Sequence, residues 1–266
     1  MNAFSVEREG NVALVTMLAP TMGFEFFTEL PQLFRELDAD PGVRAIVVGG
    51  SGANFSLGLD LKEVAPMFGA LTTGEALASG RSGLLAQVRE WQASITAVAD
   101  CRTPIISAID GWCIGGGIDL IAATDIRLAT AAARFSVRET RVAIVADLGS
   151  LQRLVGIVGD GHLRELALTG GDIDSARAER IGLVNAVYAD AAELREAAFG
   201  LARSIAANSP LVVRGVKDVL DAERAPRVEA GLRYVAAWNA AFLPSHDLNE
   251  AFASFAEHRP PEFTGE

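Results

Sequence analysis

Three short apolar runs, separated by longer segments, constrain the fold of this chain most strongly. They are "VRAIVVGG" at residues 43–50, "TPIISAIDG" at residues 103–111 and "DIRLAT" at residues 125–130. Apolar runs of this kind are typical of strands that are buried on both faces of a parallel sheet. Between the first two runs, residues 82–100 have a helical period, with Leu84, Leu85, Val88, Trp91, Ile95 and Val98 on one face. Strands that alternate with helices predict an α/β fold with right-handed crossovers.

The two ends of the chain have different patterns. Around the turn signal "EGN", residues 4–8 and 12–17 predict a β-hairpin. A helix is expected next, because Phe27, Leu30, Phe34 and Leu37 recur at helical spacing, with Thr28 as its cap and Pro31 in its first turn. From about residue 190 onward the pattern is helical throughout. We therefore expect a core over residues 1–190 and a helical carboxyl-terminal lobe over residues 191–266.

Composition limits the partners and the compartment. The 266 residues are 50% hydrophobic, which is enough for one sizeable core. The formal net charge of −11 argues against nucleic acid as a partner. Cys101 and Cys113 are too few for a disulfide framework, and no spacing indicates a metal site. With no secretory signal and no membrane-spanning run, we expect a cytoplasmic protein with no membrane partner.

The stretch "GWCIGGGIDLIAATDIR" at residues 111–127 places three glycines, Gly115 to Gly117, shortly before Asp119. The pattern predicts a strand, a loop and a helix, and the first N–H groups of a helix are free to stabilise a negatively charged oxygen. A second candidate donor is the N–H of Leu59, which follows Gly58 in "NFSLGLDLKE" and is expected to open a helix. Glycines at such a turn also serve close packing alone, with Asp119 complementing the helix dipole.

The two segments occur in an order that resembles a known family. "FSLGLDLKE", followed by "PIISAIDGWCIGGGIDLIAATDIRLAT", is similar to the paired signature of the crotonase (enoyl-CoA hydratase/isomerase) superfamily. The resemblance continues through "ARFSVRET", "ALTGGDIDSARAERIGLVNAVYAD" and "FAEHRPPEF", so it covers nearly the whole chain.

This resemblance implies a spiral of ββα units and a carboxyl-terminal lobe that assembles homotrimers or homohexamers. It also implies an acyl-CoA thioester as substrate, with no cofactor beyond the coenzyme A of that substrate, and a part in fatty acid metabolism. Carried onto this chain, the thioester oxygen lies between the N–H groups of Leu59 and Gly116. The segment Leu57, Gly58, Leu59, Asp60 and Leu61 lines the path of the substrate.

Three acids select the reaction within the family. Asp119, Glu139 and Asp147 have a spacing that resembles that of the dienoyl-CoA isomerases, which convert a 3,5-diene into the conjugated 2,4-diene. In family hydratases, the third position is usually glycine. The resemblance assigns proton transfer to Glu139 and Asp147, and we expect Glu139 to be the base at C2 and Asp147 the acid at C6, with Asp119 tuning the pair.

Several alternatives stay open from the sequence alone. Glu139 also fits an exposed residue between Arg138 and Arg141, and Asp147 also fits a helix N-cap before "LGSLQRL". An enoyl-CoA hydratase is the nearest rival function. A dehalogenase or thioester hydrolase would need a histidine base, yet His162, His246 and His258 lie outside the paired motifs around Leu59 and Gly116 and outside the segment with the acids. From another class, a noncatalytic acyl-CoA-binding paralogue or an RNA-binding relative remains; the three acids argue against the first and the net charge against the second.

Overall fold

The computed structural model describes residues 1–72 and 78–266, and two sheets organise them. The large sheet has six strands in the order β1-β2-β3-β4-β6-β9. Its first pair is antiparallel and every later pair is parallel. The strands are β1 (Phe4–Glu9), β2 (Val12–Met17), β3 (Ala45–Gly50), β4 (Ile105–Ile109), β6 (Ile126–Thr130) and β9 (Ala186–Tyr188). The predicted hairpin and all three predicted apolar strands are therefore confirmed.

The small sheet gives the fold its spiral. Its order is β5-β7-β8, formed by β5 (Trp112–Ile114), β7 (Arg134–Ser136) and β8 (Ile173–Asp174). Strand β5 follows β4 and β7 follows β6, so the chain crosses from the large sheet to the small one twice in succession. This is the expected α/β arrangement of ββα units. The segment between Ile109 and the glycines was predicted as a loop, which is wrong, because residues 112–114 form β5.

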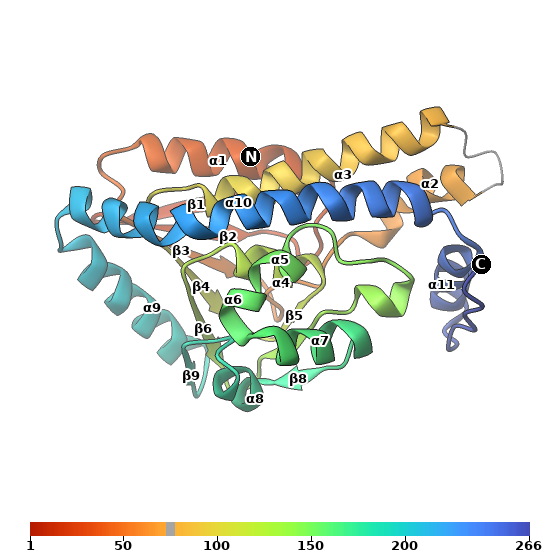
Figure 1. Cartoon of the computed structure of the whole chain (residues 1–266). Helices are drawn as coiled ribbons and strands as arrows, with labels where there is room; N and C mark the ends of the chain where they lie inside the picture. Colours follow the sequence, from red (N-terminus) through yellow and green to blue (C-terminus); the bar gives the residue numbers. More distant parts are fainter. Residues whose placement is uncertain (73–77) are drawn as a thin grey trace.

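Helices cover both sheets (Figure 1). The amino-terminal part contributes α1 (Phe24–Ala39), α2 (Leu61–Thr72), α3 (Ala78–Ala99) and α4 (Gly116–Ala122). A 3-10 turn, η1 (Glu139–Val142), precedes α5 (Ser150–Arg153), α6 (Val155–Val158), α7 (Asp160–Thr169) and α8 (Ser175–Arg180). The carboxyl-terminal part contributes α9 (Ala191–Ala206), α10 (Pro210–Phe242) and α11 (His246–Glu257). None of the helices in the described part of the chain is both long and apolar enough to cross a membrane.

Helix α1 begins earlier than the sequence pattern predicts. It starts at Phe24 after Gly23, so Thr28 is not its cap, and Pro31 lies inside the helix and not in its first turn. Proline has no N–H to donate to the carbonyl four residues before it, which here belongs to Phe27. The hydroxyl of Ser94 in α3 donates to that carbonyl. A neighbouring helix thus satisfies the acceptor that Pro31 leaves free.

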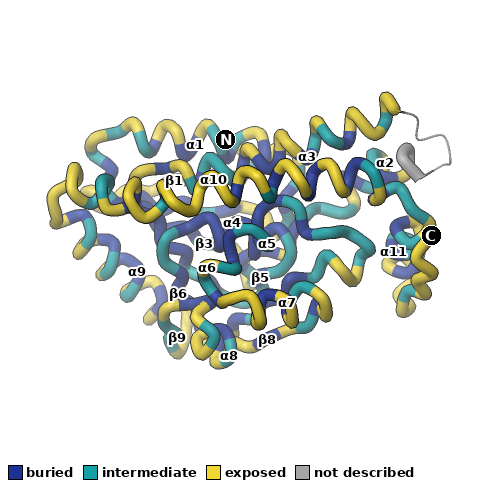
Figure 2. Tube along the Cα trace, viewed as in Figure 1, coloured by how far each residue is buried: buried dark blue, intermediate teal, exposed yellow. Residues whose placement is uncertain are grey.

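The three strands that form from the apolar runs, β3, β4 and β6, are largely buried, as those runs predict (Figure 2). In β3, Ile46 and Val48 join the main core, whereas Ala45 and Val47 pack with residues of α9 in a second cluster. The main core also receives the apolar face of α3, where the ring of Trp91 stacks on Phe27 at 5.0 Å between centroids. Buried α3 residues include Leu84, Val88, Ile95 and Val98, which the helical period had placed on one face.

The carboxyl-terminal helices pack in different places. Helix α9 begins at Ala191, capped by the carboxylate of Asp190, and covers the outer face of the large sheet. The long helix α10 runs beside α3 across the other side of the molecule, and α11 lies beside α2 (Figure 1). The division into a core over residues 1–190 and a lobe over residues 191–266 stays a prediction. Helix α9 shares a core cluster with the large sheet, and Ala236 of α10 and Leu248 of α11 belong to the main core.

Candidate active site

Two backbone segments that are far apart in the sequence meet beside α4. The segment before α2 is held against β5 by hydrogen bonds from Ser56 N to Trp112 O (2.9 Å) and from Ile114 N to Ser56 O (3.0 Å). A third bond, from Met22 N to Gly58 O (2.8 Å), fixes the next turn of this segment. The ladder brings Gly58 against the glycine stretch that follows β5. The convergence expected for an oxyanion hole is therefore present in the backbone.

The two predicted donors, the N–H groups of Leu59 and Gly116, both lie at this meeting point. A Cβ atom placed on Gly116 would lie 3.9 Å from Leu59 N, and one placed on Gly58 would lie 3.4 Å from Gly116 N. Within the described residues, neither N–H donates to a protein acceptor. Gly116 is the first residue of α4, so its N–H is one that a helix leaves free. Two backbone N–H groups without a protein acceptor are thus close together, as an oxyanion site needs.

Glycine is required at two positions of this arrangement. Gly58 has φ = 81° and Gly115 has φ = 53°, values that residues with a Cβ atom rarely adopt. A Cβ on Gly58 would also lie 3.1 Å from Ile114 O, inside normal contact distance. The two segments approach this closely only because side chains are absent. Helix α2 starts at Leu61, so the expectation that Leu59 opens a helix is wrong, and Leu59 instead pairs with Met22 in a β-bridge.

The rest of the predicted substrate-lining segment divides into exposed and structural residues. Leu57 is exposed, Gly58 is buried, and Leu59 and Leu61 pack partly against the main core. The carboxylate of Asp60 is engaged by protein donors, since it accepts from Thr21 Oγ1 at 2.8 Å and from the first N–H groups of α2. The Thr21 hydroxyl is the main cause that lowers the pKa of Asp60. Its side chain therefore caps a helix.

Glu139 lies next to the glycines. It begins η1, and its Oε1 is 3.7 Å from the position of a Cβ on Gly115. Its Oε2 is buried and has no hydrogen-bond partner among the described residues. Burial raises the pKa of Glu139, and the nearby carboxylates of Asp119 and Asp147 raise it further. An unpaired carboxyl oxygen beside two free N–H groups is suited to proton transfer, and the alternative of an exposed surface residue is wrong.

Asp119 is the most deeply buried of the three acids. It is 1% exposed on α4, and its Oδ1 accepts the N–H of Ser150 at 2.5 Å. Burial raises its pKa, while the Ser150 N–H and the guanidinium of Arg153 act in the opposite direction. Asp119 thus binds the first residue of α5, which lies shortly after Asp147. This hydrogen bond connects α4, which begins at Gly116, to the segment that contains Asp147.

Asp147 is partly buried between α10 and the other two acids. Burial raises its pKa to about 7, Asp119 raises it as well, and a hydrogen bond from Asn239 lowers it. That bond runs from Asn239 Nδ2 to Asp147 Oδ2 at 2.6 Å. The N-cap of α5 is Gly149 without a side-chain bond, so the alternative of Asp147 as an N-cap is wrong. Asp147 lies within electrostatic reach of Glu139 and Asp119, as its predicted role requires.

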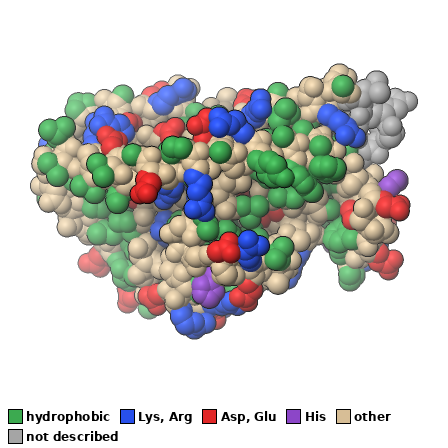
Figure 3. All heavy atoms as spheres, in the orientation of Figure 1, with side chains coloured by type: hydrophobic (Ala, Val, Ile, Leu, Met, Phe, Trp, Pro, Cys, Tyr) green, Lys and Arg blue, Asp and Glu red, His purple; other side chains and the backbone are tan. Residues whose placement is uncertain are grey.

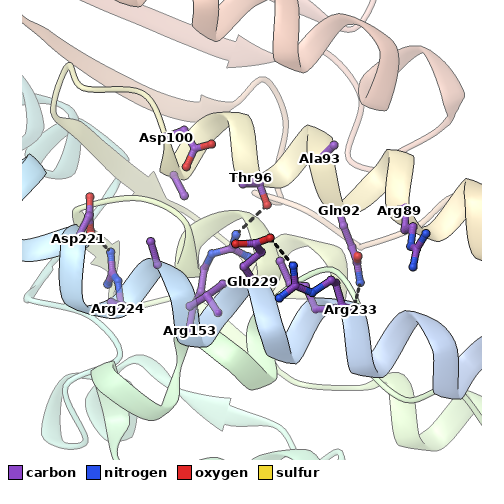
Figure 4. A pocket seen from close by; sticks show the side chains of 14 residues that line it. Arg89, Gln92, Ala93, Thr96, Asp100, Arg153, Asp221, Arg224, Glu229 and Arg233 are labelled. Carbon is purple, nitrogen blue, oxygen red and sulfur yellow. Dashed lines mark hydrogen bonds and ion pairs between the residues drawn. The ribbon is translucent and has the colours of Figure 1, made fainter.

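Two residues near Asp147 were missed by sequence reasoning. Asn239 of α10 is completely buried, and Gln92 of α3 donates from Nε2 to Asp147 O at 2.7 Å and to Leu232 O at 3.0 Å. Figure 4 shows Gln92 extending from α3 towards α10. Both residues lie far from the acids in the sequence. The sequence signal that could have found Gln92 is an amide among the apolar residues that α3 buries.

The three acids do not have the arrangement of a metal site. Within residues 1–72 and 78–266, no group of three or more His, Cys, Asp or Glu side chains could hold a metal ion. His162, His246 and His258 are all exposed, on α7 and at the two ends of α11. A histidine base for a hydrolase or dehalogenase is therefore not part of this site.

Comparison with known proteins identifies the family. The profile of the enoyl-CoA hydratase/isomerase family matches residues 7–266. The chain belongs to this family. A relative from Dictyostelium discoideum, named mitochondrial Delta(3,5)-Delta(2,4)-dienoyl-CoA isomerase, is 45% identical over 91% of this chain and 83% of its own length. A peroxisomal enzyme of the same name from Arabidopsis thaliana is 42% identical over 91% of this chain and 87% of its own length.

The fold agrees with solved members of the enoyl-CoA hydratase/isomerase family. A crystal structure of such a protein from Pseudoalteromonas atlantica T6c has a TM-score of 0.84 and 25% sequence identity, and the match covers 98% of this chain and 100% of that one. The expected spiral fold is therefore confirmed along nearly the whole chain.

Proposed function

We propose that this protein is a dienoyl-CoA isomerase, which converts 3,5-dienoyl-CoA into 2,4-dienoyl-CoA. The observation that carries the proposal is the second titratable acid, Asp147, placed near Glu139 with a pKa of about 7. Moving both double bonds requires one group that removes a proton and another that returns one at a distance. Relatives at 42% and 45% identity carry the name of this activity.

The geometry of the site supports the following reaction. Glu139, as carboxylate, takes the proton from C2 of the substrate, and the electron pair of that C–H bond enters a conjugated dienolate. Its oxygen accepts hydrogen bonds from the N–H groups of Leu59 and Gly116, each worth about 3 to 4 kcal/mol by analogy with measured oxyanion donors. Asp147, as carboxylic acid, gives its proton to C6. The product is the 2,4-diene, and no electrons enter or leave the substrate.

Asp119 has a supporting part in this mechanism. It is buried and bound to Ser150 N–H, so it holds the chain next to Asp147 in place. Its charge raises the pKa of both Glu139 and Asp147. A higher pKa makes the ionised form of Glu139 a stronger base, and a pKa of about 7 leaves about half of Asp147 protonated at neutral pH. The segment from Leu57 to Leu61 completes the proposal as the wall of the substrate path.

We also propose that the protein assembles as a homotrimer, with a homohexamer as the alternative. Helix α10 supports this, because it exposes a series of large apolar side chains: Leu211, Val212, Val216, Val219, Leu220, Tyr234, Trp238 and Phe242. Hydrophobic side chains gather over the face that α10 crosses (Figure 3). Large exposed apolar patches mark interaction surfaces. The proposed cytoplasmic location stays a prediction, and the two relatives are named for mitochondria and peroxisomes.

A pair of absorbance assays tests the proposed function. With 3,5-dienoyl-CoA, we expect absorbance of the conjugated 2,4-dienoyl thioester to appear. With 2-trans-enoyl-CoA, we expect little loss of the conjugated absorbance that hydration removes. Fast hydration without isomerisation would assign the chain to the hydratases, and tight acyl-CoA binding without turnover of either substrate would make it a noncatalytic paralogue.

A further inference from the structure

We propose that Asn239 is the positioning residue for Asp147, and that it fixes both the direction of this carboxyl and its proton affinity. The inference rests on the proposed function for its kinetic consequence, but not for the electrostatic one. Asn239 belongs to α10, 92 residues from Asp147 in the sequence. Helix α10 therefore supplies a side chain that contacts the acid centre.

The side chain of Asn239 is held in one orientation. Its Nδ2 donates both to Asp147 Oδ2 at 2.6 Å and to Val145 O at 2.8 Å. Both protons of the amide are thus used, one on the carboxyl and one on the main chain two residues before it. The residue is 0% exposed, so water does not compete for these bonds. A donor fixed in this way points the carboxyl of Asp147 in one direction.

The oxygen of this amide shows that the arrangement costs stability. Asn239 Oδ1 is buried and has no partner among the described residues. A buried, unsatisfied amide oxygen is destabilising, and an apolar residue of the same volume would avoid it. Asparagine at this position costs stability, and its two donors give that cost a functional reason.

Gln92 of α3 holds the same residue by its backbone. Its Nε2 donates to the carbonyl of Asp147 and to that of Leu232 in α10. It lines a groove of about 570 Å³ between α3 and α10, which Figure 4 shows. Asp147 is therefore held by two hydrogen bonds: Gln92 donates to its main-chain carbonyl and Asn239 donates to its carboxyl. Of these two, the bond from Asn239 is the one whose strength depends on the charge of the carboxyl.

The charges around Asp147 make this donor important. Asp119 from α4 disfavours the ionised form of Asp147, and Asp147 in turn raises the pKa of Glu139 from η1. From α3 and α10, the neighbours are the neutral amides of Gln92 and Asn239. A donated hydrogen bond favours the ionised carboxylate. Asn239 thus stabilises the form that Asp147 takes after it has given its proton to C6.

Three variants test the inference. Asn239→Leu removes both donors at similar volume, and Asn239→Asp keeps the shape but replaces the amide with an acid. Gln92→Leu is the matched control, since it releases the main chain of Asp147 and leaves the carboxyl contact intact. In each, the pKa of Asp147 is followed by ¹³C NMR of carboxyl-labelled protein, with the signal assigned by its loss in Asp147→Asn. Thermal melting confirms that each variant is folded.

We expect the pKa of Asp147 to rise by about one unit in Asn239→Leu, the size of a hydrogen bond to a charged group, and by more in Asn239→Asp. It should stay unchanged in Gln92→Leu, although that variant melts at a lower temperature. Isomerisation by Asn239→Leu should fall about 10- to 100-fold in kcat with little change in KM, because a misdirected acid slows chemistry and not binding.

The outcomes separate the inference from the proposed function. An unchanged pKa of Asp147 in both Asn239 variants would overturn the inference, and so would an equal shift in Gln92→Leu. Wild-type protein that fails to isomerise 3,5-dienoyl-CoA would overturn the proposed function, while the NMR titration would still decide whether Asn239 controls Asp147.

Discussion

Replacement of Glu139 by glutamine tests the proposed base directly. The two side chains have the same shape, so the packing around η1 should be preserved. Glutamine cannot take a proton from C2, and a positioned general base contributes about 10²- to 10⁴-fold to a rate. We therefore expect kcat for 3,5-dienoyl-CoA to fall by that factor, which corresponds to about 3 to 5 kcal/mol of activation free energy.

The structure indicates that this loss will not come from unfolding. Glu139 Oε2 is buried without a partner, and burial together with two neighbouring acids raises the pKa of the group. A neutral amide removes the repulsion among the three acids, so Glu139→Gln should be at least as stable as the wild type above neutral pH. The conservative control is Glu196→Gln, an exposed position on α9 where we expect full activity.

Isotope exchange in D₂O identifies which proton is lost. Under conditions where the wild type exchanges deuterium at C2 and C6, Glu139→Gln should exchange at neither position at a measurable rate, because the dienolate does not form. Asp147→Asn should still exchange at C2 while it fails to deliver deuterium to C6. If exchange at C2 survived in Glu139→Gln and vanished in Asp147→Asn, the order of the two acids would be reversed, and if Glu139→Gln kept full activity, the reasoning would be refuted.

Four further predictions follow from the same geometry. The pH profile of kcat/KM should be bell-shaped with its maximum between about pH 7 and pH 8, because the active form has Glu139, with a pKa of about 8, ionised and Asp147, with a pKa of about 7, protonated. This form is a minor fraction of the protein at every pH, and a flat profile from pH 5 to pH 9 would contradict the assignment. Asp147→Asn should raise the free energy of unfolding. Because folding raises the pKa of the Asp147 carboxyl, this group makes the folded wild type less stable as pH increases from about 4 to 7, and asparagine removes the effect. This gain in the free energy of unfolding should be absent near pH 4, grow up to pH 7 and reach at most about 4 kcal/mol before solvent screening. Equal denaturant midpoints of the variant and the wild type at pH 8 would contradict the prediction. Gly58→Ala should reduce kcat about 10- to 100-fold, because the added methyl group displaces the Ile114 carbonyl and the Gly116 N–H from their positions beside residue 58. Acyl-CoA binding, measured by calorimetry, should persist, and an unchanged kcat would count against the oxyanion hole. If the protein forms the proposed trimer, Leu220→Glu on the exposed face of α10 should give smaller species in light scattering. An unchanged assembly in this variant would exclude this part of α10 from the interface.

Much of the fold could be predicted because its strands are strongly patterned. The run at residues 43–50 forms β3 over Ala45–Gly50, and both of its faces are buried, as its continuous apolar character indicates. Strand β5 was missed, because three residues between a turn and a glycine run carry no period. The start of α1 was misplaced, because the effect of Pro31 on the helix is offset by Ser94, a residue of another helix.

The candidate site could be predicted only in part. Leu59, Gly116 and the three acids follow from local motifs that resemble those of a family, and their meeting depends on the ladder between the Ser56 segment and β5. The contributions of Asn239 and Gln92 depend on how α3 and α10 pack, which no local pattern specifies. Asp60 lies within a motif that resembles the family and was predicted to line the substrate path, but its carboxylate caps α2.

A crystal structure of the protein with bound 2,4-dienoyl-CoA tests the central claim most directly. We expect the thioester oxygen about 2.7 to 3.1 Å from both Leu59 N and Gly116 N, the distance at which backbone donors stabilise an oxyanion. Glu139 should then lie beside C2 and Asp147 beside C6 of the acyl chain. A thioester oxygen bound away from these two N–H groups, or an acyl chain that passes neither carboxyl, would contradict the mechanism.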